Sequence, residues 1–272
     1  MSEYRVTDEA SVVLLIPGMT LNASMFPALG RPTIAAEYHD LRLGPDGVPD
    51  TLLRQRMDLY VRMLHDQLAR EPRWQGRRIV VAHSFGGMLA LRWQLTAGGD
   101  DDARIDGLVL ISTTAGPLFE RVGLRLGTLL GHELRLPVSP FMQLWNTRAV
   151  TRQVKRHLSG GSLKAERVDF AALSHRSDLA LELAGWRNTD WRAMRSYRTA
   201  MAGFDVRAGL PQITVPVVVL HGSRDSLFPV SAARELAYGL PAAELRLVEG
   251  AGHGLPLTHP ESVMRAVEDL FD

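Results

Sequence analysis

The stretch Val80-Val81-Ala82-His83-Ser84-Phe85-Gly86-Gly87 decides how the rest of this sequence is interpreted. Its apolar start is typical of a buried strand, and the segment that follows it, Met88–Trp93, has the composition of a helix. A serine on a sharp turn between a strand and a helix exposes its hydroxyl at the end of the sheet, beside the positive end of the helix dipole. The pattern therefore predicts a nucleophile at Ser84. Its chemistry requires a base, an orienting acid and an oxyanion hole from other parts of the chain.

Length and composition narrow the class of protein. The chain has 272 residues, 46% hydrophobic and 22% charged, as expected for one domain or for a domain with a large insertion. It contains no cysteine, which excludes disulfides and cysteine–zinc sites, and its net charge of +1 gives no argument for nucleic-acid binding. The first apolar run, Val12–Ile16, is too short for a signal-peptide core or a membrane span. We therefore expect a cytoplasmic protein that binds neither nucleic acid nor a membrane.

Short apolar runs that end in turn-forming residues recur along the chain. The predicted strands are Val12–Ile16, Ile79–Ala82, Leu108–Ile111, Val217–Leu220 and Leu245–Val248, with a weaker candidate at Tyr38–Leu43. Helical periodicity covers Leu52–Ala69, Gly86–Thr96, Ser231–Tyr238 and Pro260–Phe271. Continuous apolar runs indicate strands buried on both faces, and the alternation of strand and helix predicts an α/β fold with a mostly parallel central sheet flanked by helices. Ligands bind such a sheet at the carboxyl ends of its strands.

One long segment interrupts this alternation. Between Ile111 and Val217 the sequence predicts no strand. The expected elements are instead amphipathic helices over Leu118–Leu130, Pro140–Leu158, Ala165–Ala184 and Asp190–Phe204. We expect an inserted helical cap at residues 115–208, which covers the active face as a lid, and a core domain formed by residues 1–114 and 209–272.

Three further segments carry reactive groups just after predicted strands. His221-Gly222-Ser223-Arg224-Asp225 supplies a carboxylate, and Gly250-Ala251-Gly252-His253 supplies an imidazole. Pro17-Gly18-Met19-Thr20 follows the first strand, where the glycine allows a tight turn. The backbone N–H of Met19 is then expected to face that of Phe85.

In these residues the sequence resembles the α/β-hydrolase family, over nearly the whole chain. The resemblance implies that Ser84 is the nucleophile, that His253 is the general base and then the general acid, and that Asp225 orients His253. It also implies that the N–H groups of Met19 and Phe85 form the oxyanion hole. Each backbone donor to a developing oxyanion is worth roughly 3 kcal/mol in well-studied enzymes.

The chain departs from the family pattern at three places. Ala82 stands where the motif around the nucleophile usually begins with glycine, and Pro17 stands where many members have histidine. The antiparallel N-terminal hairpin of the full fold is missing or reduced to a segment such as Tyr4–Val6. None of these differences removes a catalytic group.

Several other residues compete for these roles. His259 precedes Pro260 and is expected near the start of the last helix, while His83 is expected to pack beside the site and His221 to end its strand in a structural role. Ser112-Thr113-Thr114 offers no carboxylate at the alternative acid position of the family, which favours Asp225. The chain also lacks a His-Glu-x-x-His motif, a phosphate-loop lysine and a Gly-x-Gly-x-x-Gly after a strand. We therefore expect no metal and no cofactor.

The predicted cap contains most of the residues that we consider for substrate binding. Candidate substrate-binding residues are Phe141, Met142, Trp145, Trp186 and Leu255. Aromatic and methionine side chains at helical spacing are, however, more often simple packing between cap and core. Residues 116–208 contain 15 basic and 8 acidic side chains, a balance that suits an anionic substrate or an acidic acyl carrier protein. The alternative is a solvated helix face without a partner.

These observations favour a serine hydrolase, similar to carboxylesterases, that cleaves a small to medium, mostly apolar carboxylic ester through an acyl-enzyme. A thioesterase acting on acyl-CoA or an acyl carrier protein, a lactonase and a carbon–carbon bond hydrolase use the same triad and remain alternatives. A different class is a non-hydrolytic ligand receptor or a cyclase-like biosynthetic enzyme on the same scaffold. The sequence does not decide the oligomeric state.

Overall fold

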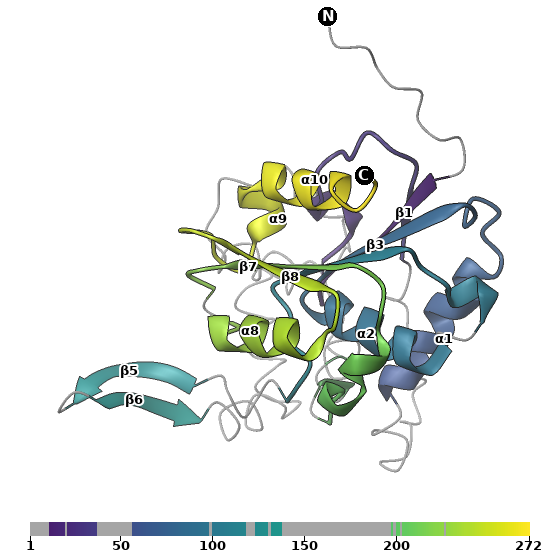
Figure 1. Cartoon of the computed structure of the whole chain (residues 1–272). Coiled ribbons are helices and arrows are strands. Elements are labelled where there is room, and N and C mark those ends of the chain that lie inside the picture. Colours follow the sequence, from purple (N-terminus) through teal and green to yellow (C-terminus); the bar gives the residue numbers. More distant parts are fainter. Residues whose placement is uncertain are drawn as a thin grey trace, which may run out of the picture.

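A computed structural model describes residues 11–19, 21–36, 56–97, 100–117, 123–129, 132–137, 197, 200–201, 203–225 and 227–272. Within this part of the chain, six parallel strands form one sheet in the order β2-β1-β3-β4-β7-β8 (Figure 1). The strands are β1 (Ser11–Ile16), β2 (Thr33–Ala35), β3 (Arg77–His83), β4 (Gly107–Ile111), β7 (Val217–Gly222) and β8 (Ala243–Val248).

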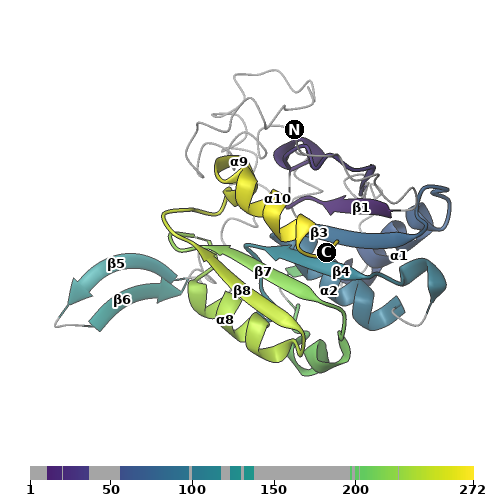
Figure 2. The same ribbon diagram turned by 45° about the horizontal axis from the view of Figure 1, so that its top comes forward.

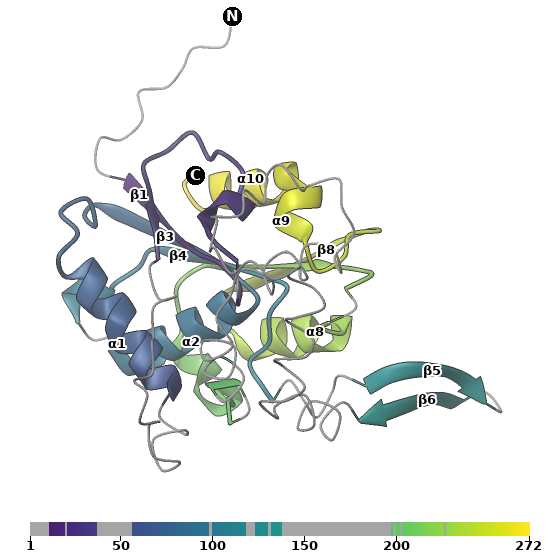
Figure 3. The ribbon, with the colours of Figure 1, turned by 180° about the vertical axis from the view of Figure 1, so that it is seen from behind.

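Helices cover both faces of the sheet (Figures 1 and 3). One face carries α1 (Arg56–Leu68), α2 (Phe85–Ala97) and α8 (Val230–Gly239); the other carries α9 (Leu255–Thr258) and α10 (Pro260–Glu268). Successive residues of a strand point to opposite faces, so Val80 and Ala82 belong to the first apolar cluster and Ile79 and Val81 to the second. Short 3₁₀ turns lie at Ala23–Met25, Asp101–Ala103 and Arg207–Gln212.

Most of the predicted elements are confirmed. The five principal strand predictions fall within β1, β3, β4, β7 and β8, and the four helix predictions fall on α1, α2, α8 and α10. The expectation that every strand is buried on both faces is wrong for β8, whose side chains are half-buried or exposed because it is an edge strand. Strand β2, which contributes three residues only, was not predicted, and the weak candidate at Tyr38–Leu43 lies outside the described residues.

The helix predicted over Leu118–Leu130 is wrong for the residues that the structure describes. Gly123–Leu129 is a strand, β5, that pairs antiparallel with β6 (His132–Pro137), and this hairpin projects away from the main sheet (Figures 1 and 2). The apolar spacing that suggested a helix contains Gly123 and Gly127, which weaken helices, and it is followed by the alternating Leu134-Arg135-Leu136. The helix predictions at Pro140–Leu158 and Ala165–Ala184 lie outside the described residues, whereas Tyr197, Ala200 and Met201 are helical as predicted.

The two ends of the predicted insertion lie side by side. The N–H of Val206 donates to the carbonyl of Ala115 at 2.8 Å, so the chain leaves the core and returns to it at one place. Just before the return, Tyr197 is buried against the core. Its ring stacks on Tyr60 with centroids 5.4 Å apart and meets the edge of Phe85 at 5.1 Å. The end of the insertion therefore packs against the residue that follows Ser84.

The register of the sheet aligns the strand ends that matter for function. Ile16 of β1 pairs with Ala82 of β3, and His83 pairs with Ile111 of β4, which in turn pairs with Leu220 of β7. The turns after these strands consequently begin at nearly the same level, on one edge of the sheet. Gly86 allows the turns after β1 and β3 to touch, because a Cβ at this position would lie 2.3 Å from the Ile16 carbonyl oxygen and 2.4 Å from that of Pro17.

Candidate active site

Ser84 occupies a strained turn between β3 and α2. Its φ of 53° lies in the left-handed region, which a residue with a side chain adopts only where the surroundings impose it. The surroundings do so here: the Ser84 N–H donates to the Ile111 carbonyl at 2.9 Å, and the Thr113 hydroxyl donates to the Ser84 carbonyl at 2.7 Å. Both partners belong to the end of the neighbouring strand β4 and the turn that follows it. The Ser84 side chain is thereby directed out of the sheet, and it is only partly buried.

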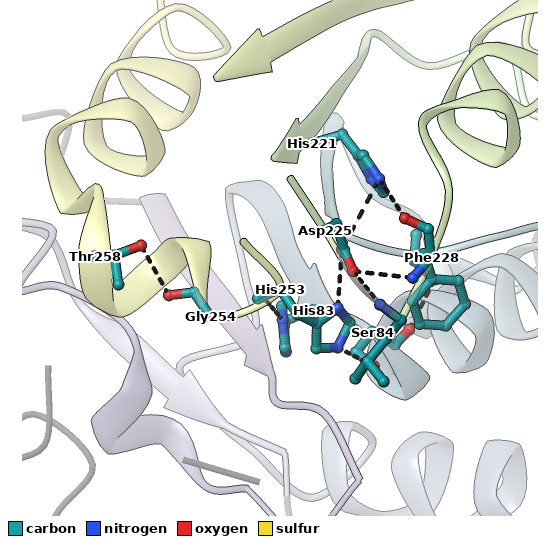
Figure 4. Close-up of polar contacts among 10 residues, drawn as sticks. His83, Ser84, His221, Asp225, Phe228, His253, Gly254 and Thr258 are labelled. Carbon is teal, nitrogen blue, oxygen red and sulfur yellow. Dashed lines mark hydrogen bonds and ion pairs between the residues drawn. The ribbon is translucent and has the colours of Figure 1, made fainter. Parts of the chain in front are cut away.

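Asp225 follows β7 and presents a fully buried carboxylate. Its Oδ1 accepts hydrogen bonds from the N–H groups of Leu227 and Phe228, both at 2.9 Å, and its Oδ2 lies 2.9 Å from Nδ1 of His253 (Figure 4). Burial alone would raise the pKa of this carboxyl group. The charge and hydrogen bond of His253, aided by the Phe228 N–H, outweigh burial and lower the pKa to about 2. Asp225 is therefore ionised at neutral pH.

His253 lies between Asp225 and Ser84. It follows β8 through the loop Glu249–Gly252, and its Nε2 is 3.1 Å from the Ser84 hydroxyl oxygen (Figure 4). Because a carboxylate only accepts hydrogen bonds, Nδ1 carries the proton that bonds Asp225, which leaves the lone pair of Nε2 for the serine hydroxyl. The Phe228 ring stacks on the imidazole, with centroids 5.4 Å apart and planes 19° apart. The arrangement can move a proton from the serine to the histidine.

The two proposed oxyanion donors belong to turns that touch. Met19 follows β1, and Phe85 is the first residue of α2. Gly18, beside Met19, lies so close to the nucleophile turn that a Cβ there would be 3.2 Å from the Ser84 Cβ. Both N–H groups thus come from chain segments in direct contact with Ser84, and Phe85 stands at the start of a helix, where the helix dipole attracts negative charge.

Some of the remaining residues that the sequence analysis considered for the site lie outside the part of the chain that the structure describes. Phe141, Met142, Trp145 and Trp186 lie outside the described residues. Leu255 is fully buried at the start of α9, in the apolar cluster between the sheet and α10. His259 precedes α10, as expected from Pro260, and its Nδ1 lies 2.9 Å from the hydroxyl of Thr258.

Two buried histidines flank Asp225 and His253, and sequence reasoning gave them only a packing role. Nε2 of His221 lies 3.1 Å from the Phe228 carbonyl and 3.8 Å from Asp225 Oδ2. Nε2 of His83 lies 2.9 Å from the carbonyl of His253 itself. Burial lowers the pKa of both rings, in His83 to about 3, with repulsion by His253 as the second cause. Both rings are therefore neutral at neutral pH.

The described residues contain no cluster of three or more His, Asp or Glu side chains suited to a metal ion. Within the same residues, no helix has the length and apolar character needed to cross a lipid bilayer.

The profile of the alpha/beta hydrolase family matches residues 13–266 of the sequence. The chain belongs to the alpha/beta hydrolase family. It is accordingly a hydrolase, and the match extends over both parts of the predicted core and over the predicted insertion between them.

Relatives of this alpha/beta hydrolase include proteins named as esterases. The pimeloyl-[acyl-carrier protein] methyl ester esterase of Nitrosomonas europaea is 28% identical over 239 residues, which cover 85% of this chain and 84% of the relative. The enzyme of the same name from Aromatoleum aromaticum is 40% identical over 70 residues, which are 28% of its length. The chain thus spans about a quarter of that relative. In Bacillus subtilis, the AB hydrolase superfamily protein YisY is 26% identical over 59% of its length.

Solved structures agree on the fold. An esterase from Exiguobacterium antarcticum superposes with a TM-score of 0.65 at 18% identity, over 97% of this chain and 93% of the other. A hydrolase from Pseudomonas aeruginosa gives a TM-score of 0.63 at 21% identity, over 97% of this chain and 91% of the other. At these identities the likeness concerns the arrangement of sheet and helices.

Because the His83 ring is neutral in the folded protein, we expect the free energy of unfolding to depend on pH in the acidic range. Between about pH 6.5, the ordinary pKa of histidine, and about pH 3, the unfolded chain binds a proton at His83 that the folded protein does not bind. The free energy of unfolding therefore decreases as the pH falls through this window, by about 1.4 kcal/mol per pH unit from this residue. In His83→Gln the contribution is absent. Denaturant unfolding of both proteins from pH 7 to pH 4 measures the difference, and parallel curves would contradict the assignment.

Proposed function

We propose that this alpha/beta hydrolase is a serine hydrolase that cleaves a small to medium, mostly apolar carboxylic ester through an acyl-enzyme. One observation carries the proposal: Ser84 Oγ, His253 and the Asp225 carboxylate form a continuous chain of contacts at 3.1 Å and 2.9 Å. A serine hydroxyl is a poor nucleophile until a base removes its proton, and this geometry provides that base. The match to named esterases supports ester hydrolysis in particular.

In the first half of the reaction, Ser84 Oγ attacks the ester carbonyl carbon as Nε2 of His253 takes the hydroxyl proton. The negative charge that develops on the carbonyl oxygen is stabilised by the N–H groups of Met19 and Phe85. The tetrahedral intermediate collapses when the imidazolium returns the proton to the departing alcohol oxygen, which leaves the acyl group on Ser84. Water then attacks the acyl-enzyme, with His253 again as the base, and releases the acid.

Asp225 acts through His253. Its carboxylate keeps the imidazole in the tautomer with the proton on Nδ1 and stabilises the positive charge that the ring carries in each transition state. Because the pKa of Asp225 is about 2, the carboxylate stays charged at every pH at which the neutral imidazole can act as a base. The two backbone N–H donors fix the carboxylate itself, so the whole chain of groups is preorganised.

A carrier-bound substrate is the second candidate, and two observations favour it. A relative that matches 85% of this chain is named for the methyl ester of a pimeloyl-[acyl-carrier protein]. Independently, residues 116–208 carry 15 basic against 8 acidic side chains, a charge that attracts an acidic partner. The same nucleophile, base and oxyanion donors cleave esters and thioesters alike. An acyl carrier protein is therefore the macromolecular partner that we propose.

The nucleophile and base are tested by substitution. We expect Ser84→Ala and His253→Asn to lower kcat for p-nitrophenyl butyrate by about 10³- to 10⁶-fold, since either change abolishes proton-coupled attack, and Asp225→Asn by about 10⁴-fold. The wild-type protein should release a burst of one equivalent of p-nitrophenol in rapid-mixing experiments, as expected for an acyl-enzyme. Retention of kcat within tenfold in Ser84→Ala would rule out the proposed mechanism.

The carrier hypothesis is tested by charge reversal. Arg148, Arg152, Lys155 and Arg156 form a basic run in the insertion, and their replacement by glutamate should lower kcat/KM for an acyl carrier protein methyl ester by about tenfold or more. Turnover of p-nitrophenyl butyrate should not change. The matched control reverses Arg62 of α1 and Arg70, which follows this helix, both of them exposed, and should leave both substrates unaffected. If kcat/KM for the acyl carrier protein methyl ester changes neither with the charge reversal nor with added salt, electrostatic recognition of the carrier is refuted.

A further inference from the structure

His83 belongs to one chain segment of the candidate active site, and its imidazole contacts two others. It belongs to the nucleophile turn, as the residue before Ser84. Its Nε2 lies 2.9 Å from the carbonyl oxygen of His253, and the two imidazole rings are 4.8 Å apart at their centroids (Figure 4). The other ring nitrogen, Nδ1, lies against the turn after β1 that carries the proposed oxyanion donor Met19. A Cβ on Gly18 in this turn would be only 2.9 Å from Nδ1. The ring is completely buried.

We propose that His83 is a positioning residue for the hydrolytic reaction. Its Nε2–H donates to the main-chain carbonyl of His253 and thereby holds the general base at the distance from Ser84 that proton transfer requires. The inference rests on the proposed function, because it assigns His83 a role through His253. His83 touches neither substrate nor the reacting atoms, so it is not a catalytic residue.

The hydrogen-bond chemistry fixes the state of the ring. A carbonyl oxygen only accepts, so the proton of His83 is on Nε2 and the lone pair is on Nδ1. Within the described residues Nδ1 has no hydrogen-bond partner. A second proton on the ring would be buried beside Gly18 without an acceptor, which agrees with the lowered pKa of this histidine. One neutral tautomer is therefore strongly favoured.

The loop that carries His253 is attached to two neighbouring chain segments. Between β8 and α9, the chain is fixed early in the loop by the Gly250 N–H, which donates to the Ser223 hydroxyl at 2.9 Å, and by the Ala251 carbonyl, which accepts from the Arg224 N–H at 2.9 Å. Both contacts attach the loop to the segment after β7, which carries Asp225. The bond from His83 attaches the same loop, at His253, to the nucleophile turn. It thus links base and nucleophile through the backbone, independently of the 3.1 Å side-chain contact.

Two amide substitutions separate positioning from packing. Glutamine places its amide nitrogen where histidine has Nε2 and can still donate to the His253 carbonyl, whereas the shorter asparagine places its amide group where histidine has Nδ1. We expect His83→Asn to lower kcat for p-nitrophenyl butyrate by about 10- to 100-fold with KM within twofold, since small displacements of a reacting group cost about this much. We expect His83→Gln to recover kcat to within about threefold of wild type.

A control separates positioning from loss of stability. Leu68→Ala removes a buried side chain at the end of α1, which carries none of the candidate active-site residues, and should lower the Tm while kcat below the Tm stays unchanged. Equal kcat values in His83→Asn and His83→Gln, or a loss of kcat that merely follows the Tm, would overturn the inference. If Ser84→Ala retains activity, the proposed function fails. If Ser84→Ala is inactive and His83→Asn is fully active, only the role of His83 fails.

The tautomer of His83 can be measured in the wild-type protein, so the inference is testable even if His83→Asn does not fold. Imidazole ¹⁵N NMR at pH 7 should show His83 with a proton on Nε2 and none on Nδ1. A ring with its proton on Nδ1, or with both nitrogens protonated, cannot make the proposed bond and would overturn the inference.

Discussion

The parallel hydrogen-bond register of β1, β3, β4 and β7 is the constraint on which the candidate site depends. It places Ile16, Ala82 and Leu110 side by side, and one residue further it places His83, Ile111 and Leu220 side by side. A slip of one residue in any pair would turn buried side chains to the opposite face, so two apolar clusters on the two faces hold this register. This register determines the relative positions of the turns that carry the reactive groups.

A buried negative charge is the second constraint. An unpaired carboxylate in a protein interior costs several kcal/mol, and the Asp225 side chain has no exposed surface. The N–H groups of Leu227 and Phe228 and the His253 ring offset this cost. Burial keeps the flanking rings of His83 and His221 neutral, and His253 at 2.9 Å lies closer to the carboxylate than His221 at 3.8 Å.

The sequence was sufficient to predict the core fold and the residues that meet at its edge. Continuous apolar runs made the central strands recognisable, and Ser84, Asp225 and His253 could be chosen because each follows such a strand. Short and ambiguous segments were not predictable: β2 has three residues, and Gly123–Leu129 fits a helical as well as an alternating pattern. The function suggested for His83 was incomplete for a different reason. Its partner, the carbonyl of His253, lies 170 residues away in the chain and is a backbone atom, which leaves no pattern in the sequence.

We propose that the strand-end geometry makes Ser84 a nucleophile. Incubation with a fluorophosphonate, followed by intact-mass and peptide mass spectrometry, tests it most directly, because such reagents phosphonylate a serine that a neighbouring base activates. We expect one phosphonyl group per chain, located on Ser84, and no adduct when His253 is replaced by asparagine. An unlabelled wild-type protein, or a label on another residue, would contradict it and would favour a non-hydrolytic role for this scaffold.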